Sequence, residues 1–430
     1  MKIFFHTFVS GANVCIIINF IIMRKLTLFT LAIFSFLILN AGTVKNGIDV
    51  LKDQRFKVLE GKRVGLITNP TGVDGQLKSS IDILFESPNV NLVALFGPEH
   101  GVRGNIYAGD KVDSSLDPKT GLPVHSLYGK TRKPTAEMLK GIDVLVYDIQ
   151  DNGCRSFTYI SSMGLAMEAA AENNIEFIVL DRPNPLGGLK IEGNITEDKY
   201  ISFVSQFKIP YIYGLTCGEL AMMLNEERMI SQKVKLTVIK MKAWKRSMNW
   251  EQTGLEWVVA SPHIPHKHSS YYYPATGILG ELGYVSIGVG YTLPFQIVGA
   301  PWINADTLAT NLNALKLAGT IFRPIHFRPY YATLKDQLCQ GVEIHIVDYN
   351  KAKLTESQFY IMQELNKLYP SKAVLNNADS SRFNMFDKVS GSNNIREKFM
   401  QNHLFSDIKD YWYKDVDSFR KLSKKYYLYK

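Results

Sequence analysis

Glu99 and His100 have side chains that can transfer protons, and they occupy an unusual place in the sequence. They belong to the stretch LFGPEHGVRG (residues 95–104), directly after an apolar run that is typical of the end of a buried strand. Gly97, Gly101 and Gly104 surround them and indicate tight backbone geometry. A polar surface turn has the same composition, so the interpretation depends on the residues at the ends of the neighbouring strands.

Polar clusters follow four predicted strands, each at the point where the strand ends. In an open parallel sheet, ligands bind outside the carboxyl ends of the strands, so these clusters are expected at one edge. We therefore predict a polar site at that edge rather than a merely solvated rim. The clusters contain Asn69 after the first strand, Glu99 and His100 after the second, Asp148, Gln150, Asp151 and Arg155 after the third, and Asp181, Arg182 and Asn184 after the fourth.

Carboxylic acids are the groups in these clusters that are best suited to catalysis. Cleavage of a glycosidic bond needs one acid to protonate the leaving oxygen. It also needs a second group that activates water, attacks the sugar or stabilises an oxocarbenium-like centre. Burial against apolar walls would raise the pKa of Glu99 and keep it protonated. The second group is open among Asp148, Asp151, Tyr159 and an acid elsewhere.

Two interpretations fit the arginines of these clusters. Arg155 and Arg182 could form plain salt bridges to Asp148 or Asp181, or they could grip a carboxylate of the substrate. The second interpretation makes both arginines substrate-binding candidates. The other substrate-binding candidates are Asn69, Gln150, Asn184 and His263.

Other chemistries lack their motifs in this sequence. No GxGxxG or GxxxxGK[ST] supports nucleotide binding, and no GxSxG supports a serine hydrolase. His263, His266 and His268 crowd together in HIPHKH, but Pro265 breaks any helix and we expect no carboxylate nearby. We therefore expect loop histidines that hydrogen-bond or line a cleft, with no metal and no other cofactor.

The elements that must position these residues alternate between strands and helices. Several strands are apolar throughout, so both faces of a mostly parallel sheet are expected to be covered. This predicts an α/β fold: a Rossmann-like domain at 44–260, a smaller C-terminal α/β (α+β) domain at 261–430, and an active-site cleft between them. The stretch 254–304 is expected to be a long structured loop or hinge. Predicted strands are 63–72, 91–101, 143–151, 176–185, 235–241 and 341–348, and predicted helices lie around 81–85, 136–139, 160–174, 218–231 (capped by Thr216), 306–318 and 355–368.

The N-terminus is expected to be a leader. Arg24 and Lys25 open a segment whose residues 26–39 are apolar and whose end offers small residues for cleavage. We interpret 23–42 as a signal peptide and 1–22 as a mis-called start, which predicts a periplasmic or secreted protein with no stable membrane insertion after cleavage. A non-cleaved membrane anchor is the alternative.

Net charge bears on the class of partner, and cysteine spacing bears on disulfide formation. The formal net charge is +9, and loss of the leader removes three positive residues and no acid, which leaves about +6. Many positives lie in the last 25 residues, which we expect to form a solvated helical tail with aromatic anchors; no nucleic-acid motif accompanies them. Cys154, Cys217 and Cys339 are widely spaced, so we expect small buried hydrophobes rather than disulfides.

From about Gly47 to its end, the chain resembles the exo-β-N-acetylmuramidases of the NamZ type, a family long known only as a domain of unknown function. The resemblance implies a Rossmann-like domain with the catalytic glutamate at Glu99, a C-terminal domain closing the cleft, and removal of N-acetylmuramic acid from the non-reducing end of peptidoglycan fragments in cell-wall recycling. The motifs that carry it are TNPTG (68–72), FGPEHGVRG (96–104), SLYGKTRKPT (126–135), DIQDNGCRSFTYI (148–160), DRPNPLGG (181–188), YGLTCGELA (213–221) and GAPWIN (299–304).

One stretch departs from the family pattern. His263 stands where the family usually has Asn, and Val289 replaces a common Arg. These positions would shape the cleft from the second domain. Because Glu99 is retained, we expect the same class of reaction, but the substrate could differ from that of the family. The competing functions are a hydrolase or esterase acting on another wall glycan, a non-catalytic periplasmic sugar-binding protein and, more weakly, a nucleotide-dependent enzyme.

Overall fold

The computed structural model describes Met23 and residues 43–104 and 115–430. Apart from Met23, the predicted leader and its upstream segment lie outside the described residues. Within the described part of the chain, no helix has the length and apolar character needed to cross a membrane.

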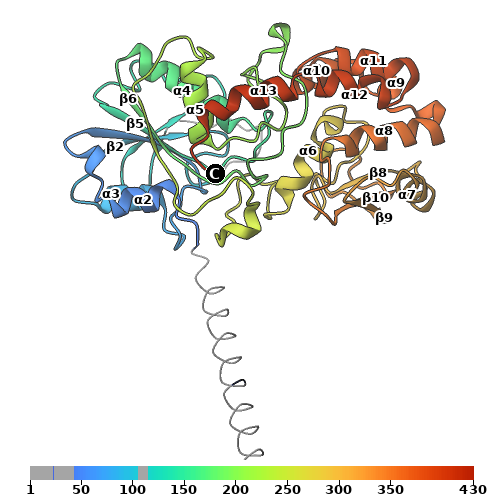
Figure 1. The fold of residues 1–430 in the computed structure, drawn as a ribbon, viewed down its shortest axis with the longest axis horizontal. Coiled ribbons are helices and arrows are strands. Elements are labelled where there is room, and N and C mark those ends of the chain that lie inside the picture. The colour runs from blue at the N-terminus through green and yellow to red at the C-terminus, as the bar shows by residue number, and fades with distance from the viewer. Residues whose placement is uncertain (1–22, 24–42, 105–114) are drawn as a thin grey trace, which may run out of the picture. The chain divides into compact units, whose positions relative to one another are not determined.

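A seven-stranded sheet and the helices packed on it form the first lobe (Figure 1). The strand order is β3-β4-β2-β1-β5-β6-β7, and all neighbouring strands run parallel except β3 and β4. The predicted α/β class with a mostly parallel sheet is confirmed. The strands are β1 (Arg63–Thr68), β2 (Asn91–Gly97), β3 (Ser115–Leu116), β4 (Pro123–Ser126), β5 (Val144–Asp148), β6 (Glu176–Leu180) and β7 (Leu236–Ile239).

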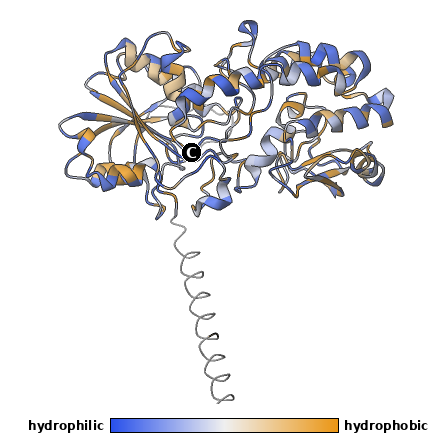
Figure 2. Cartoon of the chain, in the orientation of Figure 1, coloured by the Kyte–Doolittle hydropathy of each residue, from blue (hydrophilic) through white to orange (hydrophobic). Residues whose placement is uncertain are grey.

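Both faces of this sheet are buried, as the unbroken apolar runs predict. Val144 and Val146 of β5 pack in one core with helices α2 (Gly47–Asp53) and α3 (Ser80–Glu86). Leu145 and Tyr147 point to the opposite core, which also contains α4 (Tyr159–Glu172) and α5 (Cys217–Glu226). Figure 2 shows the hydrophobic colours gathered on the strands of this sheet.

The start of α5 follows its predicted cap. The Thr216 hydroxyl accepts a hydrogen bond from the Glu219 N–H, and the Glu219 carboxylate accepts one from the Thr216 N–H, which forms a capping box. This cap fixes where the chain turns from the 211–216 segment into the helix.

A smaller antiparallel sheet and the helices around it form the second lobe. Its strand order is β8-β10-β9, and α7 packs against β9 and β10. The strands are β8 (Ile297–Ala300), β9 (Thr320–Phe327) and β10 (Cys339–Ile346), and the helices are α6 (Ser269–Gly280), α7 (Ala305–Ala314), α8 (Glu356–Leu368), α9 (Val374–Asn377), α10 (Phe383–Ser390), α11 (Asn394–Asn402), α12 (Ser406–Tyr413) and α13 (Val416–Ser423).

Two local predictions are wrong and one strand was missed, each for an identifiable reason. Residues 136–139 form turns rather than a helix, because so short an apolar segment cannot offset the cost of helix nucleation. The stretch 254–304, expected to be a loop or hinge, contains α6 and β8. Helix α6 is buried along most of its length, so tertiary packing stabilises it despite the low helix propensity of its aromatic residues and Pro274. Strand β9 is absent from the predicted strands, because Pro324 interrupts its pattern. Within the described residues β9 pairs with β10 alone, so Pro324 lies in an edge strand.

The C-terminal segment returns to the first lobe instead of forming a solvated tail. The Leu428 N–H donates to Glu219, the Tyr429 hydroxyl donates to Asp181, and Arg246 lies 3.4 Å above the ring of Tyr427. Its expected aromatic anchors therefore pack on α5 and its surroundings. The three cysteines are free and buried, as predicted.

Candidate active site

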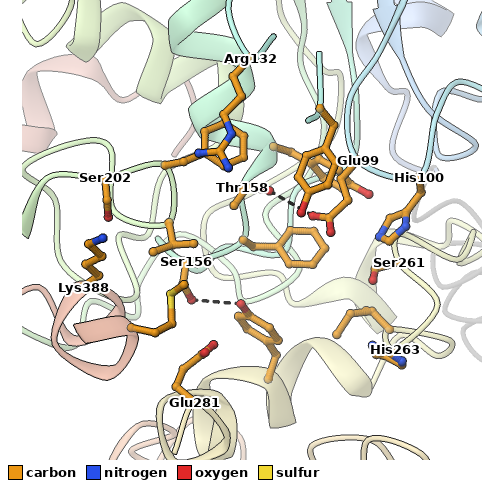
Figure 3. A pocket seen from close by; sticks show the side chains of 18 of the residues that line it. Glu99, His100, Arg132, Ser156, Thr158, Ser202, Ser261, His263, Glu281 and Lys388 are labelled. Atoms are coloured by element: carbon orange, nitrogen blue, oxygen red, sulfur yellow. Dashed lines mark hydrogen bonds between the residues drawn. The ribbon is translucent and has the colours of Figure 1, made fainter. Parts of the chain in front are cut away.

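A pocket of about 540 Å³ lies among loops of both lobes (Figure 3). The first lobe contributes the loops after β2 and β4 and the segment before α4. The second contributes α6, α10 and the loop that precedes α6. The lining residues are Glu99, His100, Tyr128, Arg132, Ser156, Phe157, Thr158, Tyr159, Ser202, Phe203, Val204, Ser261, His263, Ile264, Tyr273, Glu281, Phe295, Met385 and Lys388.

The loop that carries Glu99 is a tight turn at the end of β2. The Gly101 N–H donates to the Pro98 carbonyl at 2.9 Å, and His100 and Gly101 both have a positive φ, at 73° and 72°. A Cβ atom on Gly97 would lie 3.1 Å from the Val102 nitrogen and 3.2 Å from the Gly101 Cα, so the turn packs closely against this position. His100 holds a conformation that costs a non-glycine residue free energy, so the surrounding structure over-determines this turn.

Two hydroxyl groups orient the Glu99 carboxylate. The Thr158 hydroxyl donates to Glu99 Oε2 at 3.5 Å, and the Tyr128 hydroxyl also hydrogen-bonds to Glu99. Burial, with the negative charge of Glu99, raises the pKa of Tyr128 to about 12, so this hydroxyl keeps its proton. Glu99 itself is half-buried and faces the pocket.

Aromatic side chains make the floor of the pocket. The rings of Phe157 and Tyr159 meet edge to face with centroids 4.9 Å apart, and Phe157 and Tyr273 do so at 5.6 Å. Burial raises the pKa of Tyr159, the charge of Glu99 adds to the rise, and the Asn69 amide opposes it. Tyr159 is therefore a neutral hydroxyl that donates to the Ala260 carbonyl. Asn69 is buried and lies outside the pocket lining.

His100 and His263 lie on the Glu99 side of the pocket (Figure 3). Burial lowers the pKa of His263 and the proximity of His100 lowers it further, whereas Glu99 opposes both effects. His263 Nε2 is 2.9 Å from the Tyr331 hydroxyl, which fixes the ring at the pocket wall.

Glu281 is the second acid of the pocket. Burial raises its pKa to about 6, and the charge of Arg382 opposes that rise. It follows α6, and it is the only acidic residue between Trp257 and Asn304. A single acid within a glycine- and aromatic-rich stretch could have marked Glu281 as a candidate site residue, but the sequence analysis did not include it.

The pocket also contains two cations that were not predicted. The Arg132 guanidinium carbon lies 4.3 Å from the centroid of the Phe203 ring, and Lys388 projects from α10. Lys388 is far from Glu99 in sequence, so no local pattern brings them together. Arg132 and Tyr128 belong to SLYGKTRKPT, a motif recognised without roles for its residues.

Other predicted site residues lie outside the pocket lining. Asp148 is fully buried and forms a two-bond ion pair with Arg182, at 2.6 and 2.9 Å. Arg182 also donates to the Val73 carbonyl. Of the two interpretations offered for Arg182, the structure therefore shows the salt bridge to Asp148.

Asp151 is likewise buried. Its Oδ2 accepts hydrogen bonds from the Gly153 N–H and the Tyr213 hydroxyl, and burial raises its pKa to about 6. The Gln150 amide donates to the carbonyls of Asp151 and Pro183. Asn184 is buried too, and its amide donates to the Leu215 carbonyl.

Arg155 is fully buried among backbone carbonyls. It donates to the carbonyls of Asn194, Ile209 and Val389 and to the Ser205 hydroxyl. Burial lowers its pKa to about 10, so it remains charged at neutral pH. These contacts tie the first lobe to α10 and place the guanidinium away from the pocket lining.

Of the histidines at 263–268, His263 lines the candidate active site, whereas His266 and His268 line a second pocket together. The ring of His268 contacts Glu251 rather than the pocket, so the expectation that no carboxylate is near them is wrong. Among the described residues, no group of three or more His, Cys, Asp or Glu side chains is placed to hold a metal ion.

A pocket that contains two acids, Glu99 from the first lobe and Glu281 from the second, together with aromatic side chains fits the two-carboxyl requirement of glycoside hydrolysis. Two family models, described as exo-beta-N-acetylmuramidase NamZ, N-terminal and C-terminal, match residues 64–268 and 271–429. The chain belongs to this exo-β-N-acetylmuramidase NamZ family.

Similar proteins agree with this membership. The peptidoglycan beta-N-acetylmuramidase NamZ of Bacillus subtilis (strain 168) is 47% identical over 386 residues, which cover 90% of this chain and 91% of that protein. A crystal structure of a DUF1343 family protein from Bacteroides fragilis NCTC 9343 is 68% identical with a TM-score of 0.88. A second one from the same organism is 30% identical with a TM-score of 0.73. Each covers 90% of this chain and 99% of the solved chain.

Proposed function

We propose that this enzyme is an exo-acting glycoside hydrolase that releases N-acetylmuramic acid from the non-reducing end of peptidoglycan fragments, with Glu99 as the general acid/base. The name of the Bacillus subtilis relative supports this class of substrate. We also propose an exported protein, periplasmic or secreted, in which 23–42 is a cleaved signal peptide and the domains are divided near residue 260.

The observation that carries the proposal is the presentation of Glu99. Its carboxylate faces a pocket and is held by the hydroxyls of Thr158 and Tyr128, so it has a fixed direction toward a bound ligand. A positioned acid within hydrogen-bond reach of the leaving oxygen is the first requirement for general acid catalysis. A volume of about 540 Å³ lies in the range of small-ligand sites and suits a terminal sugar unit better than a long glycan.

The proposed reaction moves two protons, one from Glu99 to the leaving oxygen and one from water to a base. The Glu99 carboxyl gives its proton to the glycosidic oxygen while the bond from that oxygen to C1 breaks, and the electrons of the bond stay on the leaving oxygen. Water then adds to C1 and loses a proton to a base. Of the second groups left open by the sequence, Asp148 and Asp151 lie outside the pocket lining, and Tyr159 keeps its proton because its pKa is raised. Glu281 is therefore the acid that we propose as that base.

The test is release of free N-acetylmuramic acid from a MurNAc-GlcNAc disaccharide and from longer fragments. We expect the wild-type enzyme to release one N-acetylmuramic acid at a time from the non-reducing end, and the Glu99→Gln variant to lose most of this activity. If neither protein turns over substrate and both bind the sugar, the proposal is wrong and a sugar-binding protein is the better description.

A further inference from the structure

The charged groups that line the pocket are divided between two of its sides. Figure 3 shows Glu99 and His100 across the pocket from Ser202 and Lys388, with Arg132 at the top of the view between these two sides. Glu99 must lie at the bond that is cleaved if the proposed function is right. The side with Lys388 and Ser202 therefore faces the part of the terminal sugar that points away from the leaving group.

The two pocket cations have no carboxylate partner within the described part of the protein. Across residues 43–104 and 115–430, neither Arg132 nor Lys388 forms an ion pair, whereas Arg182 and Arg246 are each paired with a buried acid. Arg132 is nevertheless held in place, because its guanidinium stacks on the Phe203 ring at 4.3 Å. A fixed guanidinium without a carboxylate partner is suited to a ligand carboxylate.

Glu281, the other acid of the pocket, forms no ion pair with Arg132 among the described residues. Glu281 lies near Arg382, a third cation, whose charge opposes the rise in the pKa of Glu281. No ion pair links Glu281 to Lys388 among the described residues, so the Lys388 ammonium is available to a ligand.

N-acetylmuramic acid differs from N-acetylglucosamine by a lactyl ether that ends in a carboxylate. We propose that Arg132 and Lys388 bind this lactyl carboxylate while Glu99 reaches the glycosidic oxygen. They are specificity-determining residues, and this inference rests on the proposed function. The substrate-binding role predicted for Arg155 and Arg182 passes to two cations that line the pocket.

The test measures wild-type and variant proteins on two substrates, one with the lactyl carboxylate and one without its charge. A chromogenic N-acetylmuramic acid glycoside and its lactyl methyl ester differ by one methyl group, which removes the negative charge of the carboxylate. We expect the wild type to prefer the acid by about tenfold to a hundredfold in kcat/KM, the range for hydrogen bonds to a charged group. The double variant Arg132→Gln/Lys388→Gln should lose most of that preference, and the two single variants show how it is shared.

Controls separate this role from a structural one. Lys130→Gln changes an exposed lysine two residues from Arg132 and outside the pocket lining, and it should leave the preference intact. Arg132→Lys keeps the charge and should retain part of the preference. If the double variant loses activity on acid and ester equally, the inference is overturned. If the wild type hydrolyses neither glycoside, the proposed function itself has failed, which is a different result.

Discussion

The carboxyl edge of the large sheet has two parts that differ in structure. We call the end of β2, with Glu99, the open half, and the ends of β5 and β6, with Asp148 and Asp181, the filled half. At β2, Glu99 faces a pocket and receives hydrogen bonds from two hydroxyls. At β5 and β6, Asp148 and Asp181 are buried, and donors from other segments surround them: Arg182 for Asp148, and Thr216, Gly218 and Tyr429 for Asp181. Acids at neighbouring strand ends therefore have different tasks, and the donors supplied by distant segments decide between them.

The difference is also one of free energy. A buried carboxylate loses its hydration, and it is tolerated only when hydrogen bonds and charges replace the lost water. In the filled half, hydrogen bonds from other segments replace the lost water, and these bonds connect segments that are distant in sequence. The open half leaves its acid accessible to a substrate.

The largest expected effect comes from Glu99→Gln in the open half. The variant keeps the shape of the side chain but cannot give up a proton, so we expect kcat on the MurNAc-GlcNAc disaccharide to fall by about 10²–10⁴-fold. Its Tm should stay close to that of the wild type, because the amide oxygen can still accept hydrogen bonds from the Thr158 and Tyr128 hydroxyls. Kinetics and thermal unfolding on the same preparation check both statements.

The next effect concerns the filled half. Arg182→Met leaves the Asp148 carboxylate buried without its partner, so we expect the free energy of unfolding to drop by about 3–5 kcal/mol. The matched control is Arg63→Met, which breaks an exposed ion pair with Asp143 and should cost far less. Denaturant unfolding measures both, and equal losses would contradict the distinction.

Stability should depend on pH through the filled half. Burial raises the pKa of Asp151 to about 6, above its value in the unfolded chain, so its stabilising contribution is present below about pH 4 and is lost as the pH rises through 6. We expect Asp151→Asn to remove about 3 kcal/mol of this decline, which corresponds to about two pKa units. Unfolding measured from about pH 4 to about pH 7 gives the difference between the proteins; identical curves would refute the assignment.

A smaller effect is expected for Glu281 in the open half. Because its pKa is raised to about 6, a base at this position becomes active as the pH rises through that value. Glu281→Gln should lower kcat/KM by about tenfold or more and should remove the limb of the pH–rate profile near pH 6. A profile with the limb unchanged would show that the base lies elsewhere.

The sequence predicted the framework better than it predicted the composition of the site. Strands such as β1 and β5 are recognisable because both faces are apolar and their ends are marked by Gly, Pro or polar residues. Glu99 could be singled out because its glycines and proline indicate a rigid loop. These signals are local, so a single segment is enough to show them.

The rest of the site depends on contacts between distant segments. Lys388 and Glu281 reach the pocket from the second lobe, and no local pattern shows which residues α10 or α6 present to it. The same limitation explains why Arg155 was expected at the site: its partners are backbone carbonyls as far away as Val389. Sequence spacing could not show that its guanidinium would be buried.

The central claim is that Glu99 gives its proton to the leaving group. The most direct test compares Glu99→Gln on two glycosides of N-acetylmuramic acid, one with a GlcNAc leaving group and one with a dinitrophenol that leaves without protonation. The account predicts a loss of about 10²–10⁴-fold on the first and little loss on the second. Equal losses on both glycosides would contradict the claim.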